Sequence, residues 1–166
     1  QWGADSNYPS LAIAISSVRE NAGDDRVVIF TGDLLGHNFP ILFFRYNGNE
    51  DVAAMKAFAD KTVAFVMDQL RTAVGDAPIM FAVGNGDSYV GYGPDSSFLA
   101  NTAELYYSSF INGSANHLTF LQSFTSGGYY FAHVPDSNIT AIGLNTMIFS
   151  PLVPGNHDEE VSVELA

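Results

Sequence analysis

The chain has no cysteine, only six lysine and arginine residues, and no apolar run long enough to cross a membrane. Without cysteine, neither a disulfide framework nor thiolate chemistry is possible, and the cellular compartment stays open. The six basic residues stand against 18 acidic ones, which gives a net charge of −12. Binding to a nucleic-acid backbone needs a basic face, so we do not expect this function. The acidity is compatible instead with solubility and with bound metal cations.

The chain does contain enough apolar material for a folded domain. Its 166 residues are 47% hydrophobic and 13% aromatic, so a sizeable core can form. No internal repeat, low-complexity tract or linker interrupts the sequence, and we therefore predict a single domain over residues 1–166. The first residue is Gln1 rather than methionine, which suggests a processed or excised segment.

Two short apolar runs, residues 27–31 and 77–83, are each followed directly by polar side chains. Both runs are typical of strands buried on both faces in a parallel sheet, and a helix-like segment between them makes a strand–helix–strand unit. Asp33 follows the first run and Asn85 the second, so both should project into the crevice at the carboxyl ends of the strands. Two such donors predict a divalent metal site. His37 adds an imidazole four residues after Asp33. In the alternative interpretation Asp33 caps a turn and His37 is an ordinary surface histidine.

The rest of the chain is expected to be mainly helical, with a hairpin near the end. The apolar periodicity predicts helices over residues 8–22 (capped by Ser10), 52–74 and 96–112, a short helical or irregular piece over 118–124, and strands over 128–134 and 138–149. The apolar stripe of the longest helix is predicted to be Val52, Met55, Phe58, Thr62, Phe65, Val66 and Leu70. Residues 38–46 fit either a strand or a hydrophobic wall beside the cleft, and residues 87–94 fit a loop at its mouth.

The two strand ends carry a family resemblance. Thr31-Gly-Asp33, followed by Gly84-Asn85-Gly86-Asp87, resembles the calcineurin-like metallophosphoesterases, and His37 is similarly placed in their acid sphingomyelinase-like branch. Three further patches are similar to the same branch and follow in the expected order, so that the resemblance covers nearly the whole chain. These patches are Asp5-Ser-Asn-Tyr-Pro9, Gly127-Gly-Tyr-Tyr130, and Leu144-Asn-Thr146 with Ser150-Pro151.

This resemblance implies a fold, a reaction and a location. The fold would be a layered α/β sandwich with a mixed sheet and flanking helices. The activity would be phosphoester hydrolysis by a sphingomyelinase-like phosphodiesterase, acting on a small-molecule or lipid phosphoester in a secreted, periplasmic or lysosomal setting. Asp33 would be shared by two divalent metal ions, zinc or alternatively manganese or iron; Asn85 would ligate one of them, and His37 would be the catalytic proton donor.

The sequence also departs from the family pattern. Residues 155–158, Gly-Asn-His-Asp, match the family block by letter, but they follow two prolines and Asn156 lies 123 residues after Asp33, so we predict a loop before a helix there. Choosing residues 84–87 instead leaves Gly86 where many members of the family have a catalytic histidine. The upstream Asp-x-His and downstream Gly-His-x-His blocks are also missing. We therefore expect an incomplete, N-terminal part of the domain that is inactive by itself.

Two other function classes remain as alternatives. One is a non-catalytic binding or scaffold domain on the same α/β fold, which Gly86 and the missing ligand blocks favour. The other is a Rossmann-like nucleotide binder, but residues 31–36 contain too few glycines for its phosphate-binding turn.

Overall fold

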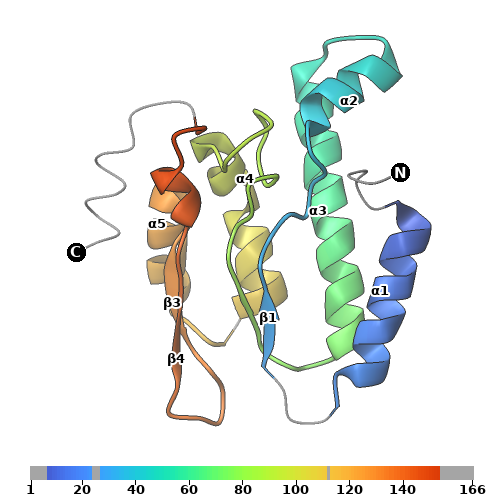
Figure 1. The fold of residues 1–166 in the computed structure, drawn as a ribbon. Helices are drawn as coiled ribbons and strands as arrows, with labels where there is room; N and C mark the ends of the chain where they lie inside the picture. The colour runs from blue at the N-terminus through green and yellow to red at the C-terminus, as the bar shows by residue number, and fades with distance from the viewer. Residues whose placement is uncertain (1–6, 24–26, 112, 154–166) are drawn as a thin grey trace.

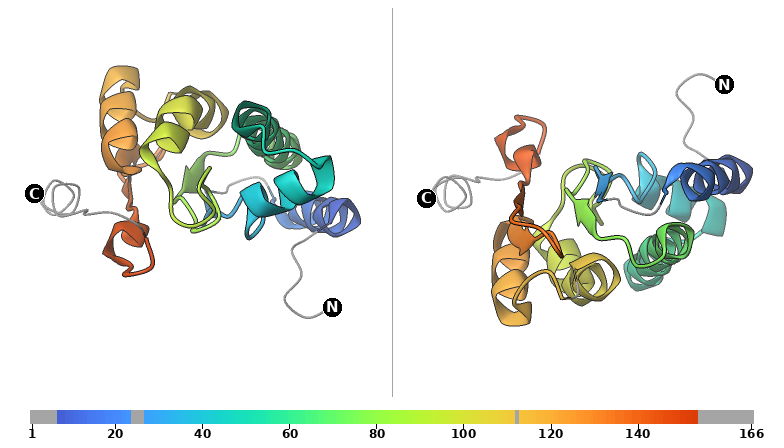
Figure 2. Two further views of the ribbon diagram at one scale, coloured as in Figure 1. Left: turned by 90° about the horizontal axis from the view of Figure 1, so that it is seen from above. Right: turned by 90° about the horizontal axis from the view of Figure 1, so that it is seen from below.

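The computed structural model describes residues 7–23, 27–111 and 113–153. It is 54% helical and 10% strand, so the α/β class is confirmed. Its elements in chain order are α1 (Tyr8–Asn21), β1 (Val28–Phe30), α2 (Phe39–Asn47), α3 (Val52–Val74), β2 (Ile79–Phe81), α4 (Ser96–Tyr106), the π-helical turn η1 (Tyr107–Ile111), α5 (His117–Gly127), β3 (Tyr130–His133), β4 (Thr140–Gly143) and the 3-10 turn η2 (Thr146–Phe149). Figure 1 shows this arrangement, and Figure 2 shows α3, α4 and α5 gathered on one side of the strands.

Asparagine and aspartate side chains start the longer helices. Asn7, Asp51, Asp95 and Asn116 each accept a hydrogen bond from a backbone N–H group three residues further along. Such caps satisfy donors that the first helical turn leaves unpaired. The prediction of Ser10 as the first cap was wrong: Asn7 takes this role, and the Ser10 N–H donates to it.

Residues 39–47 form the helix α2, so the strand prediction for this stretch was wrong. Pro40 stands in the first turn, where its missing N–H costs no hydrogen bond, and Gly48 ends the helix in the left-handed conformation. Phe39 and Phe43, four residues apart on one helix face, both pack on Phe58 of α3, with ring-centroid distances of 5.8 and 5.6 Å.

The bounds predicted for α3 are confirmed, but its predicted apolar stripe is only partly right. Met55 and Leu70 are buried, as predicted, in a buried stripe that also includes Ala59, Val63, Met67 and Ala73. Phe58 and Phe65 are 51% and 42% exposed. These large rings pack beside smaller helices instead, Phe58 on α2 and Phe65 against Tyr8 of α1.

The strands β1 and β2 pair in parallel, as predicted, with Val28, Ile29 and Phe30 opposite Ile79, Met80 and Phe81. β2 is buried throughout. β1 is not buried on both faces: Ile29 is 78% exposed, because no described element covers that side of the strand. The predicted hairpin is present as the antiparallel pair β3–β4, although its second strand ends at Gly143.

One mixed sheet was expected, but the described strands pair as two separate two-stranded sheets. The Tyr130 side chain joins them. Its hydroxyl accepts a hydrogen bond from the Phe81 N–H (2.6 Å) and donates one to the Phe81 carbonyl oxygen (2.8 Å). A side chain thus satisfies the backbone groups that a third strand would otherwise have paired. None of the described helices is long and apolar enough to span a membrane.

Candidate functional site

Two turns meet where β1 and β2 end. Because the strands are parallel neighbours, the turn after Phe30 and the turn after Phe81 lie at the same edge, at the upper ends of the strands in Figure 1. The Asp33 side chain crosses from one turn to the other: its Oδ1 accepts a hydrogen bond from the Gly86 N–H at 2.8 Å. Asp33 thus contacts the turn that carries Asn85, and Asp33 itself is exposed.

Three glycines allow the backbones of these turns to approach each other closely. A Cβ atom would lie 2.1 Å from the Gly84 nitrogen if added at Gly32, and 2.3 Å from the Asp33 nitrogen if added at Gly84. One added at Gly86 would lie 2.6 Å from the Leu35 carbonyl oxygen. Such distances are too short for any side chain unless the backbone moves. The absence of a histidine at position 86 therefore follows from the packing of these turns.

Asp33 has an uncommon backbone conformation, with φ of +61°. Left-handed values cost energy for residues other than glycine, although aspartate tolerates them better than most. The conformation is held by two hydrogen bonds, one from the Asp33 N–H to Asp87 and one to the Asp33 carboxylate from Gly86. Backbone strain of this kind is concentrated at functional sites in proteins.

Asp87 holds the two turns together from inside. Its side chain is fully buried and accepts three backbone hydrogen bonds, from Asp33 (3.0 Å) and Gly84 (2.8 Å) at Oδ2 and from Leu34 (2.7 Å) at Oδ1. Burial raises the pKa of the Asp87 carboxyl to about 6, against the opposite effect of these N–H groups, and the Asp33 charge adds to the rise. Sequence reasoning treated residues 84–87 as ligand-type groups and missed this bridging role. The sequence indicates this role only by the glycines after both strands and by the aspartate, Asp87, that ends the second turn.

The loop over residues 87–94, predicted at the mouth of the site, is anchored on both sides. Its Gly93 N–H donates to the Asn85 carbonyl oxygen at 2.8 Å. Tyr89, which is buried, donates its hydroxyl to Asp60 of α3 and accepts from Asn101 of α4. Lys56 of α3 lies 4.9 Å from the centre of the Tyr89 ring. The loop is therefore tied to two helices and to the Asn85 turn.

His37 lies on an exposed turn just before α2, four residues after Asp33. Within the described ranges, no group of three or more His, Cys, Asp or Glu side chains is placed to hold a metal ion. Of the two predicted metal ligands, Asp33 contacts the turn that carries Asn85 through the Gly86 N–H, and the contact recorded for Asn85 is that of its backbone carbonyl oxygen with Gly93. The Gly155–Asp158 block and the helix predicted after it lie outside the described residues.

No protein-family model matches this chain, and no curated protein sequence matches it. The resemblance to metallophosphoesterases therefore depends on the motif residues.

Proposed function

We propose that this chain belongs to a metal-dependent phosphoester hydrolase, a sphingomyelinase-like phosphodiesterase, with Asp33 and Asn85 among its metal ligands. One observation carries the proposal: the Asp33 carboxylate makes a hydrogen bond to the turn that contains Asn85, at the carboxyl edge of two adjacent parallel strands. Ligands of α/β proteins bind at this edge. The left-handed Asp33 backbone is part of this geometry, and the three glycines leave room for the two turns to approach each other.

The donors present fit part of a two-metal site. A carboxylate and an amide oxygen suit divalent cations, and the proposed ions are zinc, or alternatively manganese or iron. Bound metal ions would supply Lewis-acid stabilisation of the phosphate and an activated water. Asp33 would hold its ligand oxygen in place through the Gly86 N–H, and Asn85 would be positioned by its backbone contact with Gly93. His37 would give a proton to the leaving alkoxide oxygen.

The substrate and the location follow from the resemblance alone. We propose a small-molecule or lipid phosphoester as the substrate, and a secreted, periplasmic or lysosomal protein. A nucleic-acid backbone is a poor candidate, because the net charge of −12 would repel it.

A non-catalytic binding or scaffold domain is the second candidate. Two observations favour it: Gly86 cannot become a histidine without backbone movement, and the described residues include no group of three or more His, Cys, Asp or Glu side chains that could hold a metal ion. On this alternative the role of Asp33 and Asp87 is to hold the two turns together through their hydrogen bonds.

Hydrolysis of bis(p-nitrophenyl) phosphate by the natural protein that contains this chain separates the two candidates. With zinc or manganese present, Asp33→Asn should remove most of the rate, because the shared carboxylate would be lost. His37→Ala should lower the rate by about two to four powers of ten while the metal content stays unchanged. Asp68→Asn, an exposed carboxylate on α3, is the control and should change nothing. Full activity of Asp33→Asn would exclude the proposed site.

A further inference from the structure

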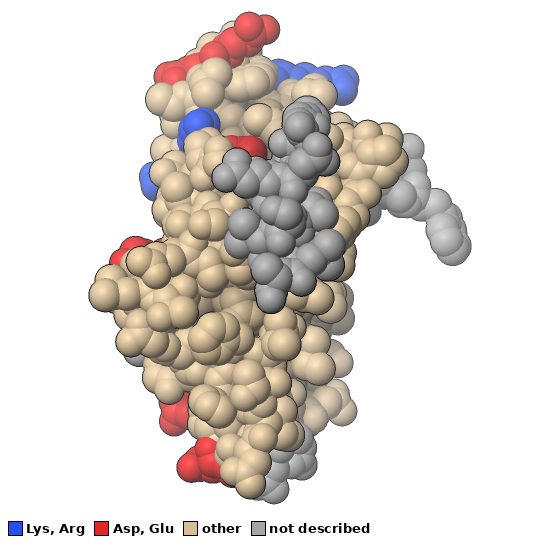
Figure 3. All heavy atoms as spheres, turned by 90° about the vertical axis from the view of Figure 1, so that its left-hand side faces the viewer, with Lys and Arg blue, Asp and Glu red and all other residues tan. Residues whose placement is uncertain are grey.

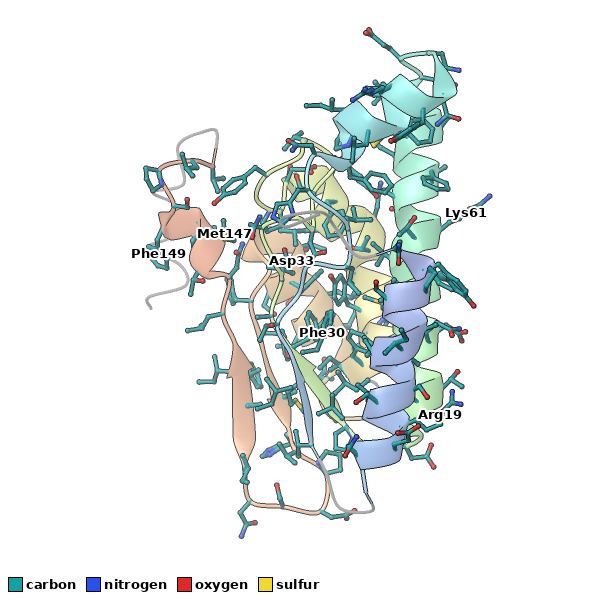
Figure 4. All side chains as sticks on the ribbon, turned by 45° about the vertical axis from the view of Figure 1, so that its right-hand side comes forward. Arg19, Phe30, Asp33, Lys61, Met147 and Phe149 are labelled. Atoms are coloured by element: carbon teal, nitrogen blue, oxygen red, sulfur yellow. The ribbon has the colours of Figure 1, made fainter. Side chains whose placement is uncertain are left out.

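A cavity of about 430 Å³ opens beside the loop whose Gly93 contacts the Asn85 turn. It lies between residues 90–95 of this loop, the first turn of α4, the end of α5 and the residues around η2. In Figure 4 Met147 of η2 and Asp33 lie at a similar height, near the middle of the molecule. The volume falls within the range of about 300–1,000 Å³ that is usual for small-molecule sites.

The walls of this cavity are mainly apolar. Six side chains supply them: Val90, Tyr92, Pro94, Leu99, Ile148 and Val153. The lining also includes the polar residues Ser96 and Ser126. A few polar groups among apolar walls are typical of sites for small organic ligands.

The charge of the lining selects against ions. Its only charged side chain is Asp95, and no lysine or arginine occurs in the chain after Arg71. Both Asp95 oxygens already accept hydrogen bonds, from Ser97 and Phe98 at Oδ1 and from Tyr89 and Ser88 at Oδ2. Burial alone would raise the pKa of Asp95, but these hydrogen bonds hold it below its usual value. The resulting carboxylate repels anions, and its oxygens are occupied and so do not call for a cation.

The cavity is preformed, because contacts fix its walls. The buried Asn145 side chain donates to the Gly127 carbonyl oxygen (2.8 Å) and accepts from the Met147 N–H (3.1 Å), which holds η2 against the end of α5. Gly93 adopts φ of +75°, and a Cβ atom there would lie 2.6 Å from a Val153 methyl group. The same Gly93 contacts the Asn85 carbonyl oxygen, so the cavity and the candidate site share one loop.

We propose that this cavity binds an uncharged, mainly apolar small molecule or substituent. The size, the apolar walls and the satisfied carboxylate support this ligand class over an anion or a cation. The proposal does not depend on phosphoester hydrolysis. A ligand in the cavity would contact the loop whose Gly93 N–H donates to the Asn85 carbonyl oxygen. Binding in the cavity would therefore affect the position of the Asn85 turn at the candidate site.

Fluorescence titration with N-phenyl-1-naphthylamine, an uncharged dye, tests the proposal directly. 1-Anilinonaphthalene-8-sulfonate has the same aromatic body with one negative charge, and it should bind at least tenfold more weakly. Ser126→Trp, which fills the cavity from α5, should weaken binding of the uncharged dye at least tenfold, and Val90→Trp should do so from the loop. Gln122→Trp places the same ring one turn earlier on exposed α5 surface and should leave binding unchanged.

Methyl NMR shifts locate the bound dye. Shifts at Leu99 and Ile148 support the proposal, whereas shifts confined to the exposed Phe131 and Ile142 of the hairpin would overturn it. Equal binding by Ser126→Trp and Gln122→Trp, both shown to be folded by circular dichroism, would also overturn it. Hydrolysis of a phosphodiester is measured in a separate assay. If the proposed reaction is not observed, the dye-binding result still tests the cavity.

Discussion

Two buried tyrosines, Tyr106 and Tyr130, stack on the ring of Phe81 at centroid distances of 4.5 and 4.6 Å, but their hydroxyls differ. The Tyr130 hydroxyl makes two hydrogen bonds to the Phe81 backbone. The Tyr106 hydroxyl is buried without a hydrogen-bond partner among the described residues. A buried polar group left unpaired costs stability, whereas one that pairs other buried groups protects them from the same cost.

The two hydroxyls should therefore have opposite effects on the free energy of unfolding. Tyr106→Phe should raise it by about 1 kcal/mol, because the unpaired group is removed. Tyr130→Phe should lower it by about 2–3 kcal/mol, because the Phe81 N–H and carbonyl groups lose their partner. Urea unfolding followed by circular dichroism measures both variants. A loss of stability in Tyr106→Phe as large as that in Tyr130→Phe would contradict the assignment.

The raised pKa of Asp87 predicts a pH dependence of stability. Its folded value of about 6 lies above the ordinary value of 3.8, so between these values the folded state keeps a proton that the unfolded chain has lost. The contribution of Asp87 to stability is therefore largest below about pH 4 and is lost as the pH rises through about 6. The difference of about 2 between the folded and unfolded pKa values corresponds to at most about 3 kcal/mol of unfolding free energy.

Unfolding free energies of the wild type and of Asp87→Asn, measured from pH 4 to 7, isolate this term from the other carboxyl groups. The wild type should lose stability relative to Asp87→Asn as the pH rises. The exposed Asp68→Asn variant should instead run parallel to the wild type. Parallel curves for the wild type and Asp87→Asn would show that the buried carboxyl titrates normally.

At the scale of elements, the two partners of the parallel sheet are buried to very different degrees. Ile29 of β1 and Met80 of β2 are paired in the register, yet Ile29 is 78% exposed and Met80 only 6%. Met80→Ala should lower the free energy of unfolding by about 2–5 kcal/mol, as for other buried side chains cut to alanine. Ile29→Ala should cost about 1 kcal/mol or less. Chemical denaturation of the two variants compares them, and equal losses would mean that β1 is covered in solution.

Helix positions could be predicted because they depend on local signals. The bounds of α3 follow from Asp51 before it, Gly75 after it and the apolar period between them. The run that forms α2 is apolar almost throughout, so its period was hidden, and only the spacing of Phe39 and Phe43 indicates a helix. The separation into two sheets could not be predicted, because it depends on the Tyr130 hydroxyl reaching Phe81, 49 residues away in sequence.

At the candidate site, too, only the features that depend on local sequence signals could be predicted. The meeting of the two turns followed from the strand ends, since parallel neighbours end at one edge. The bridging by Asp87, the anchoring of Tyr89 on Asp60 and the cavity lined by Ile148 depend on contacts between distant segments. No local pattern in the sequence indicates such contacts.

At the scale of the whole molecule, charge is unevenly distributed. All six lysine and arginine residues lie at or before Arg71, and between residues 105 and 153 the only Asp, Glu, Lys or Arg is Asp136. In Figure 3 the part of the face with α5 and the hairpin that lies below the grey atoms accordingly shows these side chains only near its left-hand edge. Phe131 and Ile142, cross-strand partners on this hairpin, are 56% and 71% exposed. The basic side chains that could bind a phosphate directly are therefore confined to the first half of the sequence.

The number of available ligands predicts what the 166-residue chain can do alone. A catalytic two-metal site needs several protein donors for each ion, and these donors need supporting contacts. The two described turns offer Asp33 and Asn85, with His37 assigned to proton transfer rather than to ligation. We therefore expect the isolated chain to hydrolyse phosphodiesters very slowly or not at all, even with added zinc or manganese, and to bind these ions weakly in calorimetric titrations. Rapid metal-dependent turnover would mean that other residues supply ligands, and His157→Ala would then be the first variant to measure.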